Sequence, residues 1–417
     1  FAATNTSNAP VTATVIVTPV YTNAGVTCTG TSITFTITVN PTPTVNVVSN
    51  QTVCNGSSTA AVNFTGAIIG TVYNWTNSTP SIGLAASGTG NIGSFTATNA
   101  TAAPVTATIT VTPSYTNGAV TCTGTPTTFT ITVNPVPTVN TVTNQVVCNA
   151  ASTTAVNFTG ATAGTVYSWT NSNPSIGLAA SGTGNIASFA AVNAGTNPVT
   201  ATITVTPSYN NAGTTCTGAS TTFTITVNPT ATVNAVASQV LCNGSSTAAI
   251  NFGSPATGGT VTFNWTNSAA SIGIAASGTG NIPTFIASNA TTTPVVATIT
   301  VTPIFTNGAV SCVGTPTTFT ITVNPTATVN AIPNQVLCNG ASTTAIVFTS
   351  PNSGNGGSNV VFNWVNNTPS IGLAASGTGN IPSFTTSNTL TNATTATITV
   401  TPTTPSGCTG LPITFTI

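Results

Sequence analysis

The sequence predicts an all-β fold, a tandem array of antiparallel β-sandwich domains. Three observations lead to this prediction. Apolar residues alternate with threonine in short segments, Gly, Pro, Asn and Ser separate these segments, and one long motif recurs every 94 to 99 residues. Alternation with a period of two is typical of a strand with one buried face, and no segment shows the period of a helix. No helix is therefore predicted.

The strands are clearest in the segment 41–134. In VTATITVTP (105–113), valine, alanine and isoleucine fall on one face and threonine on the other, and TFTITV (128–133) alternates in the same way. Further short segments with strand character lie around 51–54 and at 60–66, 71–77 and 93–99. About seven short strands separated by turn residues are typical of an immunoglobulin-like sandwich.

The same pattern recurs along the chain. The string SIGLAASGTGNI at 81–92 returns at 175–186 and 370–381, and as SIGIAASGTGNI at 271–282. Such repetition indicates an array of equivalent units. Prolines in VNPTPTVN, VNPVPTVN and VNPTATVN mark the boundaries, where we expect short, stiff linkers. The predicted units are a partial repeat with only the C-terminal strands at 1–40, and immunoglobulin-like repeats at 41–134, 135–228, 229–324 and 325–417.

The composition excludes most kinds of functional site. The 417 residues include no Lys, Arg, Asp, Glu or His. General acid–base catalysis, a Ser-His-Asp arrangement, carboxylate Ca²⁺ loops and nucleic-acid binding through Lys and Arg all need such side chains. We therefore expect no enzyme, no cofactor, no metal and no nucleic-acid partner. The chain should nevertheless fold, because 40% of its residues are hydrophobic, whereas disordered chains combine low hydrophobicity with high charge.

No run of 18 apolar residues occurs, so no membrane span is expected. A basic start followed by an apolar segment is also absent, so no signal peptide is visible. We interpret the sequence as an internal window of a longer exported chain.

The cysteines recur with the repeats. Cys54 and Cys122 could pair within a repeat, or Cys122 and Cys148 could pair across a linker. We expect Cys54 at the start of the first strand, at the same end of the domain as the hairpin that carries Cys122. One whole strand lies between Cys122 and Cys148, roughly 30 Å against a limit of about 7 Å, so pairing within repeats is favoured. The predicted pairs are Cys54 with Cys122, Cys148 with Cys216, Cys242 with Cys312, and Cys338 with Cys408.

Cys28 is left over, and we expect its partner to lie upstream of this window. Closing a loop of about 68 residues would stabilise a domain by about 4.4 kcal/mol. Persistent disulfides need an oxidising compartment, so the cysteines predict a secreted or cell-surface protein.

Each complete repeat has one tryptophan, preceded two residues earlier by Tyr or Phe on the same strand face. One interpretation is an aromatic platform that stacks a sugar ring. The favoured interpretation is a core tryptophan, as in other immunoglobulin-like sandwiches. The four residues are Trp75, Trp169, Trp265 and Trp364.

The outward strand faces carry threonine and no charge. Charged residues normally block edge-to-edge pairing of sheets, and here that protection is missing. We therefore expect the molecules to associate sideways with each other or with a surface, nearly independently of salt. Loops of variable length at 66–70, 160–164, 253–260 and 349–359 offer an alternative, the binding of a surface glycan. Ice binding by threonine arrays is a third hypothesis, disfavoured because sandwich strands twist.

Several segments resemble a known family. QTVCNGSST, YNWTNSTPSIGLAASGTGNI, VTATITVTP and CTGTPTTFTITVNPVPTV are similar to the tandem PKD-like, immunoglobulin-like repeats of very large secreted surface proteins of Bacteroidetes-type bacteria. The resemblance covers the four repeats and the partial one. It implies a seven-stranded sandwich, export to the cell surface and a role as stalk, adhesin or filament. Together with the residues, it predicts an uncharged, disulfide-stapled extracellular rod that associates with itself.

Overall fold

The computed structural model describes residues 1–352 and 359–417. The chain forms two compact units. The first contains Phe1–Gln145, Thr153–Phe189 and Ala201–Ile225, and the second contains Val146–Ser152, Ala190–Thr200 and Thr226–Ile417.

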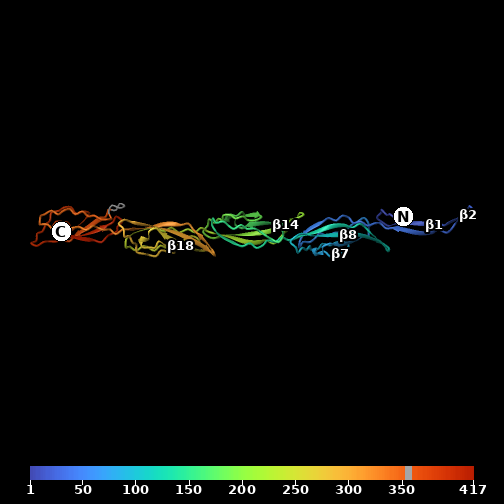
Figure 1. Ribbon diagram of the computed structural model, residues 1–417, viewed down its shortest axis with the longest axis horizontal. Coiled ribbons are helices and arrows are strands. Elements are labelled where there is room, and N and C mark those ends of the chain that lie inside the picture. The colour runs from blue at the N-terminus through green and yellow to red at the C-terminus, as the bar shows by residue number, and fades with distance from the viewer. Residues whose placement is uncertain (353–358) are drawn as a thin grey trace. The chain divides into compact units, whose positions relative to one another are not determined.

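The first unit begins with two strand pairs in residues 1–40 (Figure 1, blue). β1 and β4 pair antiparallel, with Val11 opposite Val39, and β2 and β3 form a separate hairpin. Their bounds are β1 Val11–Val17, β2 Val20–Asn23, β3 Val26–Thr29 and β4 Ile33–Val39.

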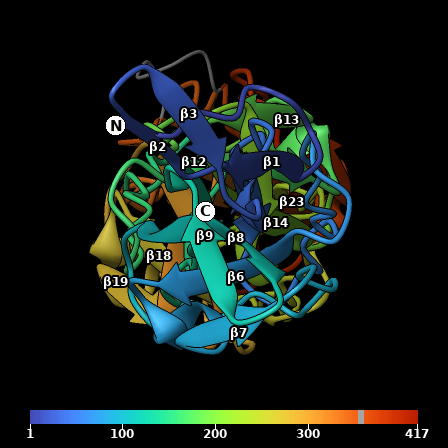
Figure 2. The same ribbon diagram turned by 90° about the vertical axis from the view of Figure 1, so that its right-hand side faces the viewer.

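A six-stranded sheet follows in the first unit. Its order is β5-β10-β8-β6-β7, with β9 paired to the end of β8. In Figure 2, β6, β7, β8 and β9 lie next to one another. All neighbours are antiparallel except β5 and β10, which run parallel. The bounds are β5 Gln51–Cys54, β6 Val72–Asn77, β7 Ser87–Thr89, β8 Val105–Asn117, β9 Val120–Thr123 and β10 Thr127–Asn134.

A second layer covers this sheet. Residues 57–62 and 92–97 run antiparallel, joined by the isolated bridges of Ser58 with Thr96 and Val62 with Ile92. Val62 and Ile92 are buried with Ile109 and Ile131, which come from the apolar faces of β8 and β10. The alternation of Val and Ile with Thr thus places one face of each strand in the core and leaves threonine outside. Two layers over one core form an immunoglobulin-like sandwich, and the fold is all-β as predicted.

The next sheet has the same order, β11-β16-β14-β12-β13 with β15 paired to β14. In β12, β13 and β14 the cross-strand partners repeat those of the sheet before it, for example Trp169 opposite Val205. The bounds are β11 Gln145–Cys148, β12 Val166–Asn171, β13 Ser181–Thr183, β14 Val199–Asn211, β15 Thr214–Thr217 and β16 Thr221–Asn228.

The second unit contains two further sheets. The first has the order β17-β22-β20-β18-β19 with β21 on β20, and the second the order β24-β23-β25-β26. Their bounds are β17 Gln239–Cys242, β18 Thr260–Asn267, β19 Ser277–Thr279, β20 Val295–Asn307, β21 Val310–Val313, β22 Thr317–Asn324, β23 Val361–Asn366, β24 Ser376–Thr378, β25 Thr397–Thr403 and β26 Ile413–Thr416.

The prediction of no helix is wrong in one detail. Among the described residues, four single turns of 3₁₀ helix stand at the repeated Ser-Ile dipeptide, and a glycine in the left-handed conformation ends each turn. Three residues are too few to give a sequence period, which explains why the pattern did not indicate them. The turns are η1 Pro80–Ile82, η2 Pro174–Ile176, η3 Ala270–Ile272 and η4 Pro369–Ile371. No helix among the described residues has the length or the apolar character needed to cross a membrane.

Every sheet takes its strands from within one of the sequence repeats. The boundaries of the repeats themselves stay a prediction.

Candidate functional site

The cysteine-bearing ends of the repeats are the most distinctive chemical feature of the molecule. Among residues 1–352 and 359–417, no cluster of three or more His, Cys, Asp or Glu side chains is placed to hold a metal ion. The cysteine sulfur atoms and the asparagine side-chain amides lie at these ends of the sheets.

In the repeats that begin with Cys54 and Cys242, the first cysteine lies at the end of a strand that runs parallel to the last strand. In the first unit, Cys54 ends β5 and stands opposite Asn134, the last residue of β10. The backbone N–H of Asn55 donates to the carbonyl oxygen of Asn134 at 2.9 Å. The side chain of Gln51 anchors the start of β5, since it both donates to and accepts from the backbone of Ala60. Cys54 is therefore held where the chain leaves the sheet.

The second cysteine of a repeat lies in a long hairpin at the opposite end. β8 and β9 form this hairpin, and Cys122 stands opposite Tyr115. The tight turn between them includes Gly118 at φ 60°, a conformation that glycine adopts without strain. β14 and β15 form the equivalent hairpin, with Cys216 opposite Tyr209.

In the first unit, Cys54 forms a disulfide with Cys216, across two neighbouring sheets. The S–S distance is 1.95 Å and the Cα atoms lie 5.6 Å apart. Two hydrogen bonds flank the bridge. Thr214 Oγ1 donates to the carbonyl oxygen of Thr52 at 3.2 Å, and Asn211 Nδ2 donates to Asn134 Oδ1 at 2.8 Å. The hairpin of one sheet is thereby fixed to the end of the sheet before it.

The second unit holds two more disulfides of the same kind, Cys148 with Cys312 and Cys242 with Cys408. Both have Cα atoms 5.5 Å apart. Near the first of them, Asn307 Nδ2 donates to Asn228 Oδ1 at 2.9 Å, which repeats the amide pair of the first unit.

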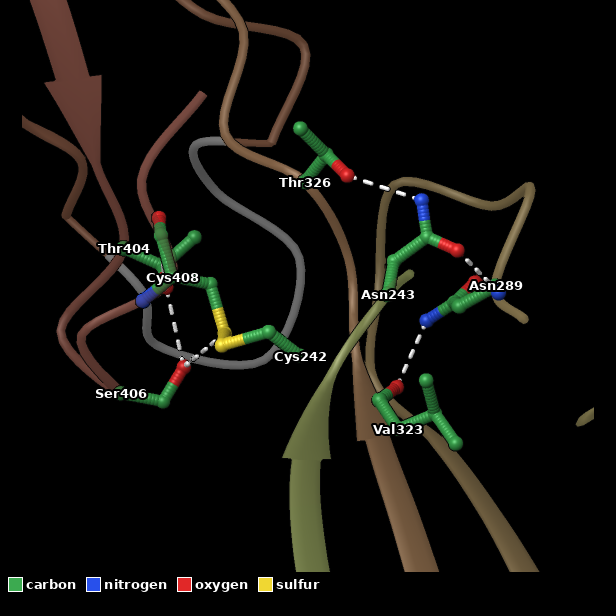
Figure 3. The surroundings of a disulfide bond; sticks show 8 residues. All are labelled: Cys242, Asn243, Asn289, Val323, Thr326, Thr404, Ser406 and Cys408. Atoms are coloured by element: carbon green, nitrogen blue, oxygen red, sulfur yellow. Dashed lines mark hydrogen bonds between the residues drawn. A yellow bond between two sulfur atoms is a disulfide. The ribbon is translucent and has the colours of Figure 1, made fainter. Parts of the chain in front are cut away.

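Figure 3 shows the surroundings of the disulfide between Cys242 and Cys408. Ser406 lies beside the sulfur of Cys408, with its Oγ at 3.8 Å. On the other side, Asn243 Nδ2 donates to Thr326 Oγ1 at 2.8 Å, and Asn243 Oδ1 accepts from the backbone of Asn289. The residue next to the cysteine thus ties the loops at the end of the sheet together.

The predicted pairing within repeats is wrong. Cys54 lies beside the end of β10 and Cys122 lies beyond its start, so the length of β10 separates them, roughly 23 Å for seven residues. A disulfide needs Cα atoms within about 7 Å. The prediction failed because β5 was expected to begin at the hairpin end, whereas it runs parallel to β10 and ends at the far side. This corrects all four expected pairs, Cys54 with Cys122, Cys148 with Cys216, Cys242 with Cys312, and Cys338 with Cys408.

Three cysteines are free among the described residues. Cys28 and Cys338 are exposed, and Cys122 is partly buried. Cys122 and Cys338 were both expected in disulfides, and that expectation is wrong for the same reason. The bridges join cysteines 162 to 166 residues apart, but the expected pairs are spaced just as regularly, so the cysteine spacing carries no signal that would have identified the correct pairing.

The tryptophans lie in the cores of the sandwiches, with 6 to 8% of each residue exposed. Trp75 packs against Gly88 on the neighbouring strand, so closely that a Cβ at Gly88 would stand 2.2 Å from Trp75 Cζ2. The indole N–H of each tryptophan is buried and has no hydrogen-bond partner among the described residues. Rings buried to this extent offer no open face on which a sugar could stack.

Two of the variable loops make contacts inside the second unit. In the loop 253–260, Thr257 donates from its backbone to Thr196 O at 3.0 Å, and its hydroxyl bonds to Asn197 Oδ1. Asn352 is buried and donates to Thr292 O at 3.3 Å. Residues 353–358 of the loop 349–359 lie outside the described residues. These loops therefore bond to the repeat that precedes their own. Their variation in length gave no indication of this contact.

Comparison with known proteins does not add a family. No protein-family model matches the chain, and no curated protein does. Solved structures similar to it include immunoglobulin domains 1–5 of Sidekick-1, at 9% identity and a TM-score of 0.26 over 98% of this chain and 94% of that one. Drosophila N-cadherin EC1–4 has 10% identity and a TM-score of 0.27 over 88% and 98%. The insect immune protein hemolin has 12% identity and a TM-score of 0.24, over 90% of this chain and 98% of hemolin. TM-scores this low carry no weight, and the fold assignment rests on the sheets described above.

Proposed function

We propose that this chain is an extracellular structural protein, a rod-like stalk or filament of tandem sandwiches that serves as an adhesin or its support. The observation that carries the proposal is the set of disulfides, each of which fixes the hairpin of one repeat to the end of the repeat before it. A covalent staple at a junction restricts bending there, and so does the direct amide pair between Asn211 and Asn134. Successive repeats held in this way favour an extended array over loosely jointed domains.

The proposed location is the cell surface or the extracellular medium. Disulfides persist in oxidising compartments and are rare where glutathione keeps thiols reduced. Bridges that close loops of 162 to 166 residues remove about 5 kcal/mol of chain entropy each when taken singly. The fold would therefore lose much of its stability in a reducing compartment. We also propose that the chain is related to the PKD-like family of surface proteins that its sequence resembles.

The proposed partner is a second copy of the same chain. β8 and β10 present paired threonines on the outer face, for example Thr106 and Thr132, whose hydroxyls are 3.0 Å apart. An uncharged face of this kind has no like-charge repulsion to keep copies apart. Light scattering of the purified protein at about 0.05 M and 1 M NaCl tests this, because sideways association should be nearly independent of salt.

Negative-stain electron microscopy tests the elongated shape. Purified oxidised protein should appear as stiff elongated particles, alone or in bundles. Labelled antibody against the chain should decorate the outside of the intact source cells. Compact or freely jointed particles, or label confined to lysed cells, would contradict the proposal.

Glycan binding by the variable loops is a second candidate, favoured by their differences in length and by Ile69, which is 96% exposed in the loop 66–70. A glycan array probed with the whole chain tests it. A bound glycan should be lost when Ile69 is changed to Ser, whereas an array without hits removes the candidate.

A further inference from the structure

The three disulfides close loops that overlap along the chain. The loop that begins at Cys148 opens before the first loop closes at Cys216, and it closes at Cys312 after the third loop has opened at Cys242. A cut at any single peptide bond between Cys54 and Cys408 therefore leaves the two pieces covalently joined. Pairing within repeats would not have this property, because the linkers between repeats would then lie outside every loop.

We propose that this overlapping connectivity makes the chain a tether of limited extension, whose length under tension is set by disulfides and not by the folding of its domains. When a chain is pulled from both ends, the shortest covalent path carries the force. Here that path runs through residues 1–54, 216–242 and 408–417, and crosses the disulfides of Cys54 and Cys242. The segments 55–215 and 243–407 lie off the path and carry no tension once it is taut.

The limit is large enough to measure. The taut path holds about 90 residues and spans roughly 310 Å at about 3.5 Å per residue. The same 417 residues without bridges would reach about 1,450 Å, nearly fivefold more. All four tryptophans lie on segments off the path, so unfolding of the chain around them adds no length beyond the limit that the oxidised path sets.

The inference deepens the proposed function, because a stalk carries load, but it depends only on which cysteines are paired. The two can fail separately. Compact particles in the microscope would contradict the stalk and leave the extension limit intact, whereas a different stretched length would overturn the limit and leave the elongated shape intact.

Single-molecule force spectroscopy on the full chain, held by handles at its two ends, is the test. Cys28, Cys122 and Cys338 are first alkylated so that the free thiols neither exchange nor cross-link. The oxidised chain should stop extending at roughly 310 Å, and the chain reduced with a phosphine should reach about 1,450 Å. A limit of roughly 490 Å, the value for pairing within repeats, would overturn the proposal, as would equal lengths with and without reductant.

Two matched double variants sharpen the test. Replacing Cys54 and Cys216 by Ser removes a bridge on the path, and the shortest route then holds about 230 residues, so the limit should rise to roughly 800 Å. Replacing Cys148 and Cys312 by Ser removes the bridge that the path does not use, so the limit should stay at roughly 310 Å. Equal limits in the two variants would overturn the proposal.

A measurement on the unaltered protein covers the case in which a variant does not fold. Limited digestion with thermolysin, at about one cut per chain, should leave a single full-mass band on a non-reducing gel for cuts between Cys54 and Cys408. The same sample should separate into fragments after reduction. Fragments released without reductant from within this region would overturn the connectivity.

Discussion

Two strand pairs of the first unit have nearly the same sequence but very different surroundings. β1 and β4 pair with Val11 opposite Val39, and β8 and β10 pair in the equivalent register with Val105 opposite Val133. The inward face of β8 and β10 is almost fully buried, with Phe129 at 3% exposure. The equivalent Phe35 of β4 is 49% exposed.

The difference lies in what covers each pair. β8 and β10 lie under the layer formed by 57–62 and 92–97, and they are flanked by β6 and β5. β1 and β4 form a sheet of two strands. Register therefore follows from the local alternation of side chains, whereas burial, and hence most of the stability, comes from the covering layer.

The largest expected contrast comes from truncating the equivalent phenylalanines. Phe129→Ala should lower the free energy of unfolding by about 3 to 5 kcal/mol, because it leaves a cavity in a closed core. Phe35→Ala should cost less than about 1 kcal/mol, since its ring is half exposed. Hydrogen exchange of the backbone amides in urea measures both changes, since residues 1–40 contain no tryptophan to report their unfolding. Equal losses would show that the pair in residues 1–40 is covered as fully as its counterpart.

A smaller loss of stability should follow when a larger side chain is placed against the core tryptophan. Residues 1–40 contain no tryptophan and so lack this contact. Gly88→Ala would place a Cβ 2.2 Å from Trp75 Cζ2 and should cost about 1 to 3 kcal/mol through displacement of the ring. Gly93→Ala is the control, because its added Cβ meets no atom within 4 Å and should change stability by less than about 0.5 kcal/mol. The fluorescence maximum should shift only in the first variant. A neutral Gly88→Ala would mean that the core yields around Trp75.

Two equivalent asparagines provide a finer comparison. Asn99 Nδ2 donates to Ala103 O and Val133 O, both at 2.8 Å, and Asn5 Nδ2 donates to Ala9 O and Val39 O at 2.8 and 2.7 Å. Asn99 is buried and Asn5 is partly exposed, so Ala at position 99 should cost about 1 to 2 kcal/mol and Ala at position 5 less than about 1 kcal/mol.

Thermal unfolding of the two asparagine variants measures this contrast. The reason is that water can replace the lost donor at Val39 but not at Val133. A larger loss at position 5 would contradict this account of the buried carbonyl.

The smallest effect concerns pH. Neither strand pair contains Asp, Glu, His, Lys or Arg, so the melting temperature should be flat from about pH 4 to pH 8. Burial raises the pKa of the Tyr73 hydroxyl above its ordinary value of 10.0, against an opposing hydrogen bond from Thr71. The folded state therefore holds this proton more tightly than the unfolded state, and stability should decline only as the pH rises above about 10.

Melting curves between pH 4 and 11, with the free thiols alkylated, measure this dependence. Tyr73→Phe should remove the part of the alkaline decline that Tyr73 causes. A transition near neutral pH would contradict the expectation.

Much of the fold could be predicted from the sequence. The alternation in 105–113 and 128–133 located β8 and β10, because a period of two leaves only one choice of buried face. The extent of β8, which continues to Asn117, was missed because proline usually ends a strand, although Pro113 lies on the buried face of β8. The segments 60–66 and 93–99 carry isolated bridges in place of full strands. Some of their backbone N–H groups donate to side chains and not to a neighbouring strand, for example Phe64 N to Asn91 Oδ1.

By itself, the sequence determined the strand periodicity, the repetition and the absence of ionisable side chains, because these are properties of residue type and order. The tertiary structure alone decided which sulfur atoms meet. The side-chain pattern of the four-residue strand β5 is the same whether the strand runs parallel or antiparallel to its neighbour. The direction of β5 nevertheless decides at which end of the sheet Cys54 lies. That direction is set by backbone pairing with residues about 80 positions away, which no local pattern encodes.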